Sequence, residues 1–95
     1  MQITEVRIRP ANRGRVRARV SITIDHCFMI SGLKVIRGPK GYFVEMPRRK
    51  QSDGTYLDFV APINLETRRM IERAIFVEFE KVTGERVTTR VSKRK

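Results

Sequence analysis

The side chains that could do chemistry in this chain are mostly cations. Its 95 residues include 21 Lys and Arg but only 10 Asp and Glu, so the formal net charge is +11. The single histidine and the single cysteine are neighbours, His26 and Cys27. Adjacent side chains of a strand point to opposite faces, so these two could hardly share a metal ion or a proton. We therefore expect no enzyme activity, no metal and no cofactor. Cys27 should pack as a small hydrophobe, and His26 should lie near a strand junction.

Three consecutive cations, Arg48, Arg49 and Lys50, are the strongest candidates for a binding site. They follow Pro47, which has no N–H to donate to a neighbouring strand. We predict a polar loop over residues 48–54. Loops on a rigid sheet often carry binding residues, and guanidinium groups fit phosphate oxygens well. The alternative interpretation is a run of charge that contacts only solvent.

A second basic group belongs to a segment of alternating polarity. Arg15, Arg17 and Arg19 alternate with apolar residues, and this period of two is typical of a half-buried strand. On one strand face they would stand about 6.8 Å apart, twice the rise per residue. Arg7 and Arg9 of the preceding segment could extend this face. Such a row could follow a phosphate backbone, or it could be a solvated outer face.

Two more cations, Arg68 and Arg69, fall at the expected start of a helix. Cations oppose the positive end of the helix dipole at this position. Arg68 could instead pair with Glu72, and Arg69 with Glu66, since residues three or four apart are neighbours on a helix. These two cations therefore offer less free charge than the three that follow Pro47.

The excess positive charge is concentrated at the two ends of the chain. Residues 1–19 hold six Arg and one acid, and residues 86–95 hold five basic residues and no acid. Residues 20–85 are nearly balanced, with ten basic and nine acidic residues. Such an excess of positive charge favours a polyanionic partner. We expect no small-molecule substrate.

Apolar periodicity predicts an α+β fold: an antiparallel sheet of four to five strands followed by one C-terminal helix. Strands are expected over residues 4–9, 15–25, 27–36, 42–46 and 56–60, with a bulge or bend at Ser31-Gly32. We expect a single domain over residues 1–84 and a basic, flexible tail over residues 85–95.

The predicted helix begins after Asn64, whose side chain can cap it, and ends at Gly84. At 100° per residue, one broad apolar arc collects seven of its residues. They are Met70, Ile71, Ala74, Ile75, Val77, Phe79 and Val82. Phe76 falls outside this arc, on the same side as Leu65, so the two could form an exposed patch for a second copy or another protein.

Nothing in the sequence indicates a membrane or an oxidising compartment. No segment approaches the roughly 20 apolar residues that a membrane-spanning helix needs. The N-terminus lacks the apolar region of a signal peptide, and one cysteine cannot form an intrachain disulfide. We expect a cytoplasmic protein with no membrane partner.

Several separated motifs occur in a characteristic order. They are ITEVRI at residues 3–8, VSITIDH at 20–26, LKVI at 33–36, GYFVEMP at 41–47, the Asp53-Gly54 turn with Tyr56 and Asp58, and PIN at 62–64 leading to Thr67-Arg68. Together, over roughly residues 2–83, they make the chain resemble the SpoVG family, also known as stage V sporulation protein G or septation protein.

The resemblance implies a homodimer that binds DNA, and in some members RNA, with regulatory effects on sporulation, septation, capsule or virulence. Carried over residue by residue, it implies nucleic-acid contacts at Arg49, Lys50, Thr67 and Arg68. Arg48 stands where many members have a small residue, and Arg69 where many have glycine; both should strengthen contact with phosphates.

Two hypotheses follow. In the first, the chain is a dimeric nucleic-acid binder that acts through Arg48, Arg49, Lys50 and Arg68, with Thr67 near a base or sugar. In the second, it is a protein-interaction module of the division or envelope machinery, and its basic surface meets an acidic partner.

Overall fold

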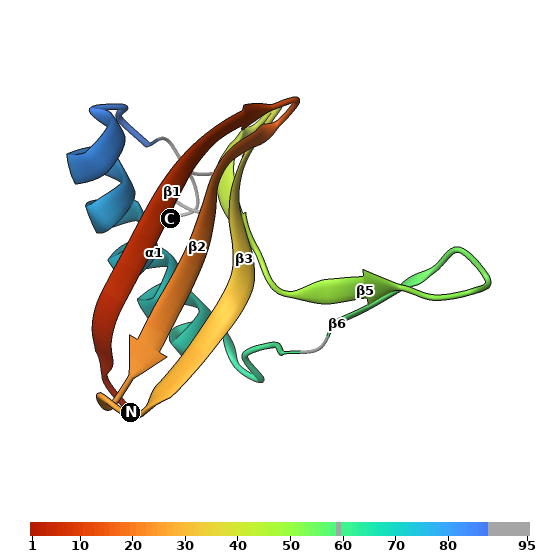
Figure 1. Cartoon of the computed structure of the whole chain (residues 1–95), viewed down its shortest axis with the longest axis horizontal. Coiled ribbons are helices and arrows are strands. Elements are labelled where there is room, and N and C mark those ends of the chain that lie inside the picture. The colour runs from red at the N-terminus through yellow and green to blue at the C-terminus, as the bar shows by residue number, and fades with distance from the viewer. Residues whose placement is uncertain (59, 88–95) are drawn as a thin grey trace.

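The computed structural model describes residues 1–58 and 60–87 and shows an α+β fold (Figure 1). Four strands form one antiparallel sheet in the order β1-β2-β3-β4. Their bounds are β1 Ile3–Arg13, β2 Val16–Ile24, β3 Phe28–Gly38 and β4 Gly41–Glu45. Two short strands, β5 Arg48–Lys50 and β6 Tyr56–Asp58, form a separate antiparallel pair, and one helix, α1 Leu65–Thr83, follows. The predicted antiparallel sheet with a C-terminal helix is confirmed.

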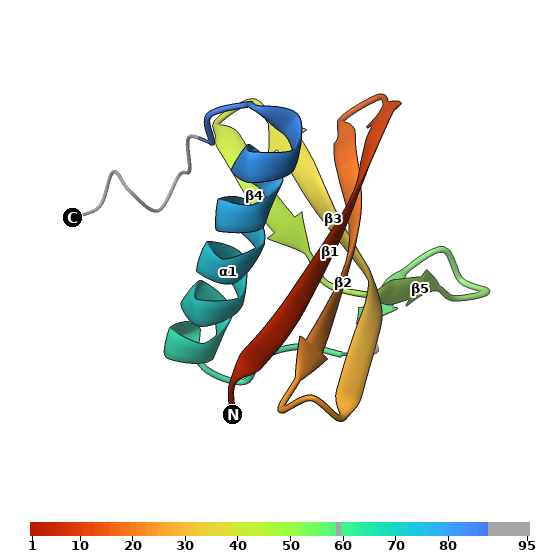
Figure 2. The same cartoon turned by 60° about the vertical axis from the view of Figure 1, so that its left-hand side comes forward.

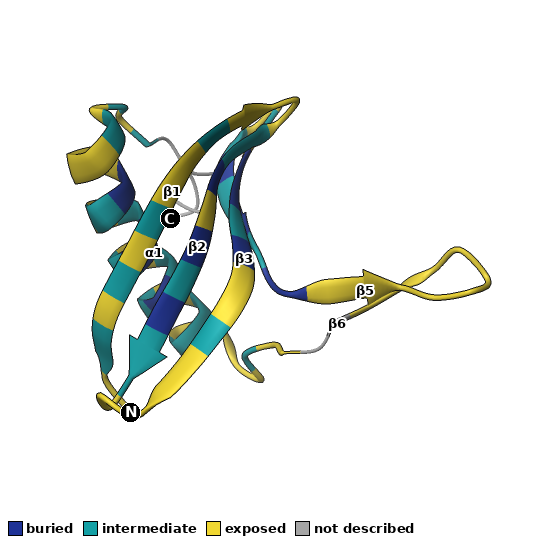
Figure 3. Ribbon diagram, in the orientation of Figure 1, coloured by how far each residue is buried: buried dark blue, intermediate teal, exposed yellow. Residues whose placement is uncertain are grey.

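The core lies between the sheet and α1. In β2 the alternating residues Ala18, Val20 and Ile22 are buried, and α1 buries Ile71, Ile75 and Phe79, which are spaced four residues apart. A period of two on the sheet thus meets a period close to 3.6 on the helix. Figure 3 shows this buried band along the sheet and the exposed residues of β5.

Both predicted ends of the helix are confirmed. The Asn64 side chain accepts a hydrogen bond from the Thr67 N–H at 2.8 Å, in the manner of an N-cap. At the other end, Gly84 adopts a left-handed φ of 77°, and its N–H donates to the Glu80 carbonyl at 2.9 Å.

The predicted apolar arc of α1 is wrong at its edges. Phe76 packs against the core, whereas Val77 and Val82 are 50% and 46% exposed. The face that meets the sheet is therefore rotated toward Phe76. Periodicity predicts that the helix has an apolar arc. Which part of that arc packs against the twisted sheet depends on tertiary contacts. The expected exposed patch of Phe76 with Leu65 does not form within this chain.

A bulge in β3 lies where the Ser31-Gly32 bend is predicted. Val20 faces Leu33 and Ser21 faces Ser31, so Gly32 has no opposite residue on β2. Its φ of 90° favours glycine. A Cβ at this position would lie 3.5 Å from the Pro47 side chain, so the bulge adjoins the corner where the chain leaves the sheet.

The residues after this corner form a two-stranded hairpin, which corrects two predictions. The expected loop over residues 48–54 is a strand over its first three residues, and β6 pairs with this strand and not with the main sheet. Pro47 is buried and lies just after the end of β4, and it has no N–H to continue the hydrogen bonds of the main sheet. The residues that follow it therefore form a separate pair of strands. Asp53 shapes the turn by accepting hydrogen bonds from the Thr55 N–H and hydroxyl at 3.0 and 2.6 Å. In Figure 2 the hairpin projects from the sheet on the side away from α1.

The β2–β3 turn holds the lone histidine and cysteine. His26 lies in the turn with a φ of 59°, which confirms its place at a strand junction. Cys27 is exposed, so the expectation that it packs as a hydrophobe is wrong. The turn reverses the chain before Cys27 can enter the sheet, and its N–H donates back to the Ile24 carbonyl at 3.0 Å.

The first residues of the expected tail contact the body of the protein. The Glu85 carboxylate bonds to Arg17 and to Tyr42, and Val87 packs against the core. The rest of the expected tail, residues 88–95, lies outside the described residues. At the other end of the chain, β1 forms an edge of the sheet and includes Pro10. Within the described residues, no helix combines the length and apolar character of a membrane span.

Candidate nucleic-acid interface

The β5–β6 hairpin, residues 48–58, presents the three strongest candidates side by side. Arg48, Arg49 and Lys50 make up all of β5, and all three are exposed. Alternation along a strand puts Arg48 and Lys50 on one face and Arg49 on the other. The candidates therefore lie on a projecting strand, which spaces them more regularly than the predicted loop would.

Neighbouring side chains hold Arg48 in place. Its guanidinium pairs with the Glu45 carboxylate at the end of β4 and lies 4.3 Å from the centre of the Tyr56 ring. A guanidinium over an aromatic face is attracted by the ring, and its planar fork loses little freedom on binding an oxyanion. Arg48 is thus ordered before any ligand arrives, although Glu45 offsets part of its charge.

The candidates at the start of the helix differ in their contacts with the rest of the protein. Arg68 donates from Nη2 to the Val44 carbonyl at 3.0 Å and pairs through Nε with Glu72 at 3.4 Å, which confirms the predicted i,i+4 pair. Thr67 borders an apolar cavity of about 130 Å³ beneath the start of α1. Arg69 is exposed on the helix. Of the two cations among these candidates, Arg69 is the more accessible.

The sheet separates the helix-start candidates from the hairpin. Arg68 reaches the backbone of Val44, whose side chain is buried in the core on the helix side. The next residue, Glu45, points to the opposite face by alternation and pairs there with Arg48. Figure 2 shows α1 and the hairpin on opposite sides of the main sheet. One copy of the chain therefore does not gather both groups of candidates on one surface.

The predicted row of Arg15, Arg17 and Arg19 does not form. A bulge between Val16 and Ala18 interrupts the register of β2 at Arg17. Arg17 instead donates to Glu85 at 2.7 Å, and Glu85 also accepts from the buried Tyr42 at 2.7 Å. Arg15 is exposed just before β2, and its carbonyl accepts from the Arg37 N–H. A bulge changes the face that a side chain occupies, and alternation alone does not reveal it.

The Arg17–Glu85–Tyr42 contacts shift the ionisation of all three groups. The hydrogen bond from Arg17, followed by that from Tyr42, lowers the pKa of Glu85. Burial, followed by the bond to Glu85, raises the pKa of Tyr42. The bond to Glu85 also raises the pKa of Arg17, so this cation is committed to an internal carboxylate. These three groups close the end of the sheet rather than forming a binding surface.

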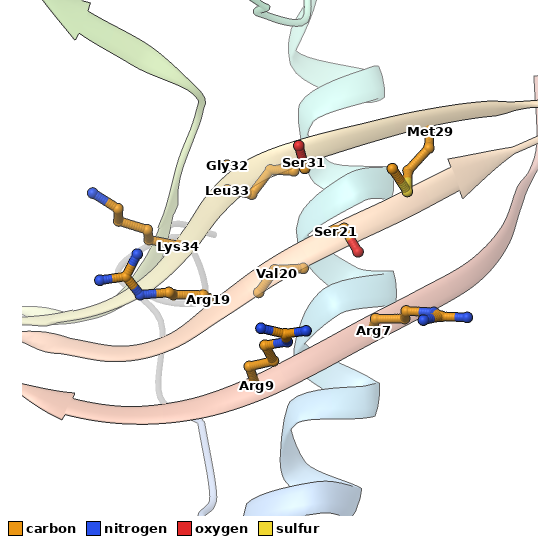
Figure 4. A pocket seen from close by; sticks show the side chains of 10 residues that line it. All are labelled: Arg7, Arg9, Arg19, Val20, Ser21, Met29, Ser31, Gly32, Leu33 and Lys34. Carbon is orange, nitrogen blue, oxygen red and sulfur yellow. The ribbon is translucent and has the colours of Figure 1, made fainter.

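A second basic surface lies in a hollow of about 410 Å³ on the sheet face away from α1 (Figure 4). We call it the outer hollow. It is lined by Arg7, Arg9, Arg19, Val20, Ser21, Met29, Ser31, Gly32, Leu33 and Lys34. Arg7 and Arg9 therefore lie on the same face of the sheet as Arg19, as expected. Sequence reasoning missed Lys34, although the alternation of Leu33, Lys34 and Val35 gave a signal, because the lysine occupies the polar position of an apolar strand.

The described residues offer no group of three or more His, Cys, Asp or Glu side chains that could hold a metal ion.

Comparison with known proteins gives a consistent match. The sequence model of the SpoVG family matches residues 1–81. A protein of Bdellovibrio bacteriovorus is 51% identical over 81 residues, which cover 85% of this chain and 75% of the relative. A protein of Myxococcus xanthus is 48% identical over 81 residues, covering 85% and 82%. A protein of Clostridium kluyveri is 47% identical over 90 residues, covering 94% of each. All three carry the name "Putative septation protein SpoVG".

Proposed function

The chain belongs to the SpoVG family, and we propose that it is a non-enzymatic regulatory protein of the cytoplasm that binds DNA, and also RNA, through its basic surface. The observation that carries this proposal is the projecting β5–β6 hairpin with Arg48, Arg49 and Lys50 exposed in a row. Three adjacent cations on a strand that stands clear of the body can approach a polyanion without a clash from the sheet or the helix.

Attraction to phosphates supplies the affinity in this mechanism, and no bond is made or broken. Lys50 contributes a mobile point charge, and the arginines contribute planar forks that match phosphate oxygens. The Arg48 guanidinium is already oriented by Glu45 and Tyr56, so it loses less conformational entropy on binding than a free side chain would. Counterions released from the nucleic acid make the affinity depend steeply on salt.

The helix-start residues take secondary roles. Arg69 adds a phosphate contact, and Thr67 supplies a hydroxyl near the start of α1. Arg68 positions the helix, because its guanidinium already bonds to Val44 and Glu72. Arg15 and Arg19 add positive potential to the sheet, while Arg17 remains in its internal ion pair.

The names of the relatives suggest the setting. Because the matched proteins are named for septation, we place the nucleic-acid binding of this chain in the regulation of septation or sporulation. A run of cations of this kind contacts phosphates whatever the base sequence, so the hairpin sets affinity, while sequence preference depends on further contacts with bases.

The proposal is tested by the triple variant Arg48→Ala/Arg49→Ala/Lys50→Ala in gel-shift titrations on DNA and RNA at several salt concentrations. We expect at least about a tenfold loss of affinity, which corresponds to about 1.4 kcal/mol. For a dimer that neutralises about six to eight phosphates, log K for the unmodified protein on duplex DNA should fall against log salt with a slope of about −5 to −7.

The matched control is Arg73→Ala/Lys81→Ala/Arg86→Ala, which removes the same charge from exposed positions of α1 and the segment after it. Equal affinities of the hairpin and control variants would show that only net charge matters and that the hairpin is not the site. A salt slope near zero would exclude nucleic-acid binding as the function.

A further inference from the structure

We propose that the outer hollow seats phosphates of the bound nucleic acid, so that the bound chain continues from the β5–β6 hairpin across the face of the sheet. Arg9, Arg19 and Lys34 are the residues that hold these phosphates. This inference rests on the proposed function and assigns that function a second, separate contact.

The register of the sheet brings the three cations into one row. Arg9 of β1 is directly opposite Arg19 of β2, and Arg19 is directly opposite Lys34 of β3. Neighbouring strands are about 4.8 Å apart, so the backbone positions of these three cations span about 10 Å. Like charges directly opposite each other destabilise a sheet. An anion bound among them would remove this cost.

In the part of the chain that the structure describes, this row carries no neutralising ion pair. In the hollow, Arg7 is paired with Glu5 at 2.9 Å. Glu45, which is opposite Lys34 on β4, is paired with Arg48. No carboxylate among the side chains described for residues 1–57 and 60–87 lies at ion-pair distance from Arg9, Arg19 or Lys34. The three charges therefore remain available to an external anion.

The walls of the hollow fit phosphate better than a base. The bulge at Gly32 leaves no side chain at the centre of the β3 wall, and the neighbouring Ser21 and Ser31 can donate hydroxyl hydrogen bonds. Among the described residues, no aromatic ring lines the hollow, so these residues give it no stacking platform of the kind that unpaired bases need. Figure 4 shows the charged groups of Arg19 and Lys34 at one end of the hollow and that of Arg9 closer to its middle.

The hollow is continuous with the hairpin. Lys34 is opposite Glu45, and the Glu45 carboxylate contacts Arg48, the first residue of β5. The Gly32 wall also adjoins Pro47 at the corner that leads into the hairpin. Both surfaces face away from α1 (Figures 2 and 4). A phosphate backbone can therefore pass from one to the other over the outer face of β4.

The test uses Arg19→Gln, which removes the central charge of the row, beside Arg73→Gln, which removes an exposed charge from α1. Without ligand at low salt, Arg19→Gln should raise the melting temperature by about 1 to 5 °C, because it relieves two like-charge pairs. The same variant should bind a DNA or RNA oligonucleotide about five- to tenfold more weakly, as for loss of a charged hydrogen bond. Its salt slope should be shallower by about 0.9 for each lost phosphate. Arg19→Lys should restore the slope.

Each outcome separates the second contact from the function as a whole. If the hairpin triple variant loses binding while Arg19→Gln behaves like Arg73→Gln, the outer hollow is not a contact, and the proposed function stands. If the unmodified protein binds no nucleic acid at low salt, both fail. If inorganic phosphate or a mononucleotide stabilises the protein as strongly as an oligonucleotide at equal phosphate concentration, the hollow serves small anions, and the continuous path is overturned.

Discussion

At the scale of single residues, the Glu85 side chain connects segments that are far apart in the sequence. It accepts hydrogen bonds from Arg17 on β2 and from Tyr42 on β4, and it directly follows Gly84, the C-cap of α1. It therefore joins two strands and the helix at one point. Arg17 remains imperfectly satisfied, because its Nε is buried without a hydrogen-bond partner among the described residues.

We predict that Glu85→Gln lowers the free energy of unfolding at pH 7 by about 1 kcal/mol, the usual net value of a hydrogen bond. The folded protein lowers the pKa of Glu85 below its ordinary value of 4.5. Its stabilising contribution is therefore present above pH 4.5 and is lost as the pH falls through the lowered pKa. Urea unfolding at pH 7, 5 and 3.5 should show the two proteins converging in acid.

The control for this prediction is Glu78→Gln, which removes a carboxylate from α1 where no ion pair is seen among the described residues. A difference between Glu85→Gln and the unmodified protein that stayed constant from pH 7 to pH 3.5 would contradict the assigned role of the carboxylate.

Residue identities predicted the kind of chemistry but not the partners. That Arg48, Arg49 and Lys50 are exposed could be predicted, because a run of cations cannot be buried. The internal pairing of Arg17 could not, because it depends on a bulge and on Glu85, which is 68 residues away in the sequence. The grouping of Lys34 with Arg9 and Arg19 could not be predicted either, because it depends on the register of three strands.

At the scale of elements, α1 depends on its capping residues. Asn64→Ala removes the side-chain acceptor of the Thr67 N–H. We expect a loss of about 1 kcal/mol in unfolding free energy and a fall of about 4 to 8 °C in melting temperature. Thermal unfolding followed by circular dichroism measures both. Asn64→Asp keeps the acceptor and should keep the stability; an equal loss in both variants would show that the cap is not the cause.

The hairpin is the element that the sequence described least well. Pro47 and the Asp53-Gly54 turn were visible, but a strand made only of cations has no alternating apolar pattern. An isolated two-stranded hairpin is only marginally stable in water. Its place beside a corner shaped by Gly32 and Pro47 is a tertiary feature, whereas the ends of α1 depend on local residues and were predicted.

At the scale of the whole molecule, the two faces of the sheet differ in chemistry. α1 covers one face, and the outer hollow and the hairpin share the other. The net charge predicted a polyanionic partner. The total charge could not show that the sheet separates the cations at the start of α1 from those of the hairpin. The consequence is that the cations of the outer hollow and of β5 lie on the side of the sheet that α1 does not cover.

The segment from β6 to the helix start favours a second copy of the chain. Leu57, Ile63 and Leu65 are 56%, 97% and 58% exposed, which is unusual for three large apolar side chains within nine residues. We predict a homodimer that buries this segment. Light scattering should give twice the chain mass of 11.1 kDa, and Leu57→Ser/Ile63→Ser should shift it toward the monomer.

Serine substitution at two other exposed apolar residues, Val77 and Val82, serves as the control for this change. A monomer at all concentrations would leave the apolar segment open. That result would favour the alternative function, a module that binds another protein of the division machinery, and binding to that partner should then survive nuclease treatment.

The position of Pro10 in the outermost strand limits how copies of this protein can join. An incoming strand needs successive N–H groups along the free edge of β1, and Pro10 has none to donate. Arg7, Arg9 and Arg13 on the same strand add mutual repulsion between two such edges. Pairing of β1 with β1 between copies is therefore disfavoured, and on the proposed function this would keep copies that bind side by side on a nucleic acid from joining through their sheets.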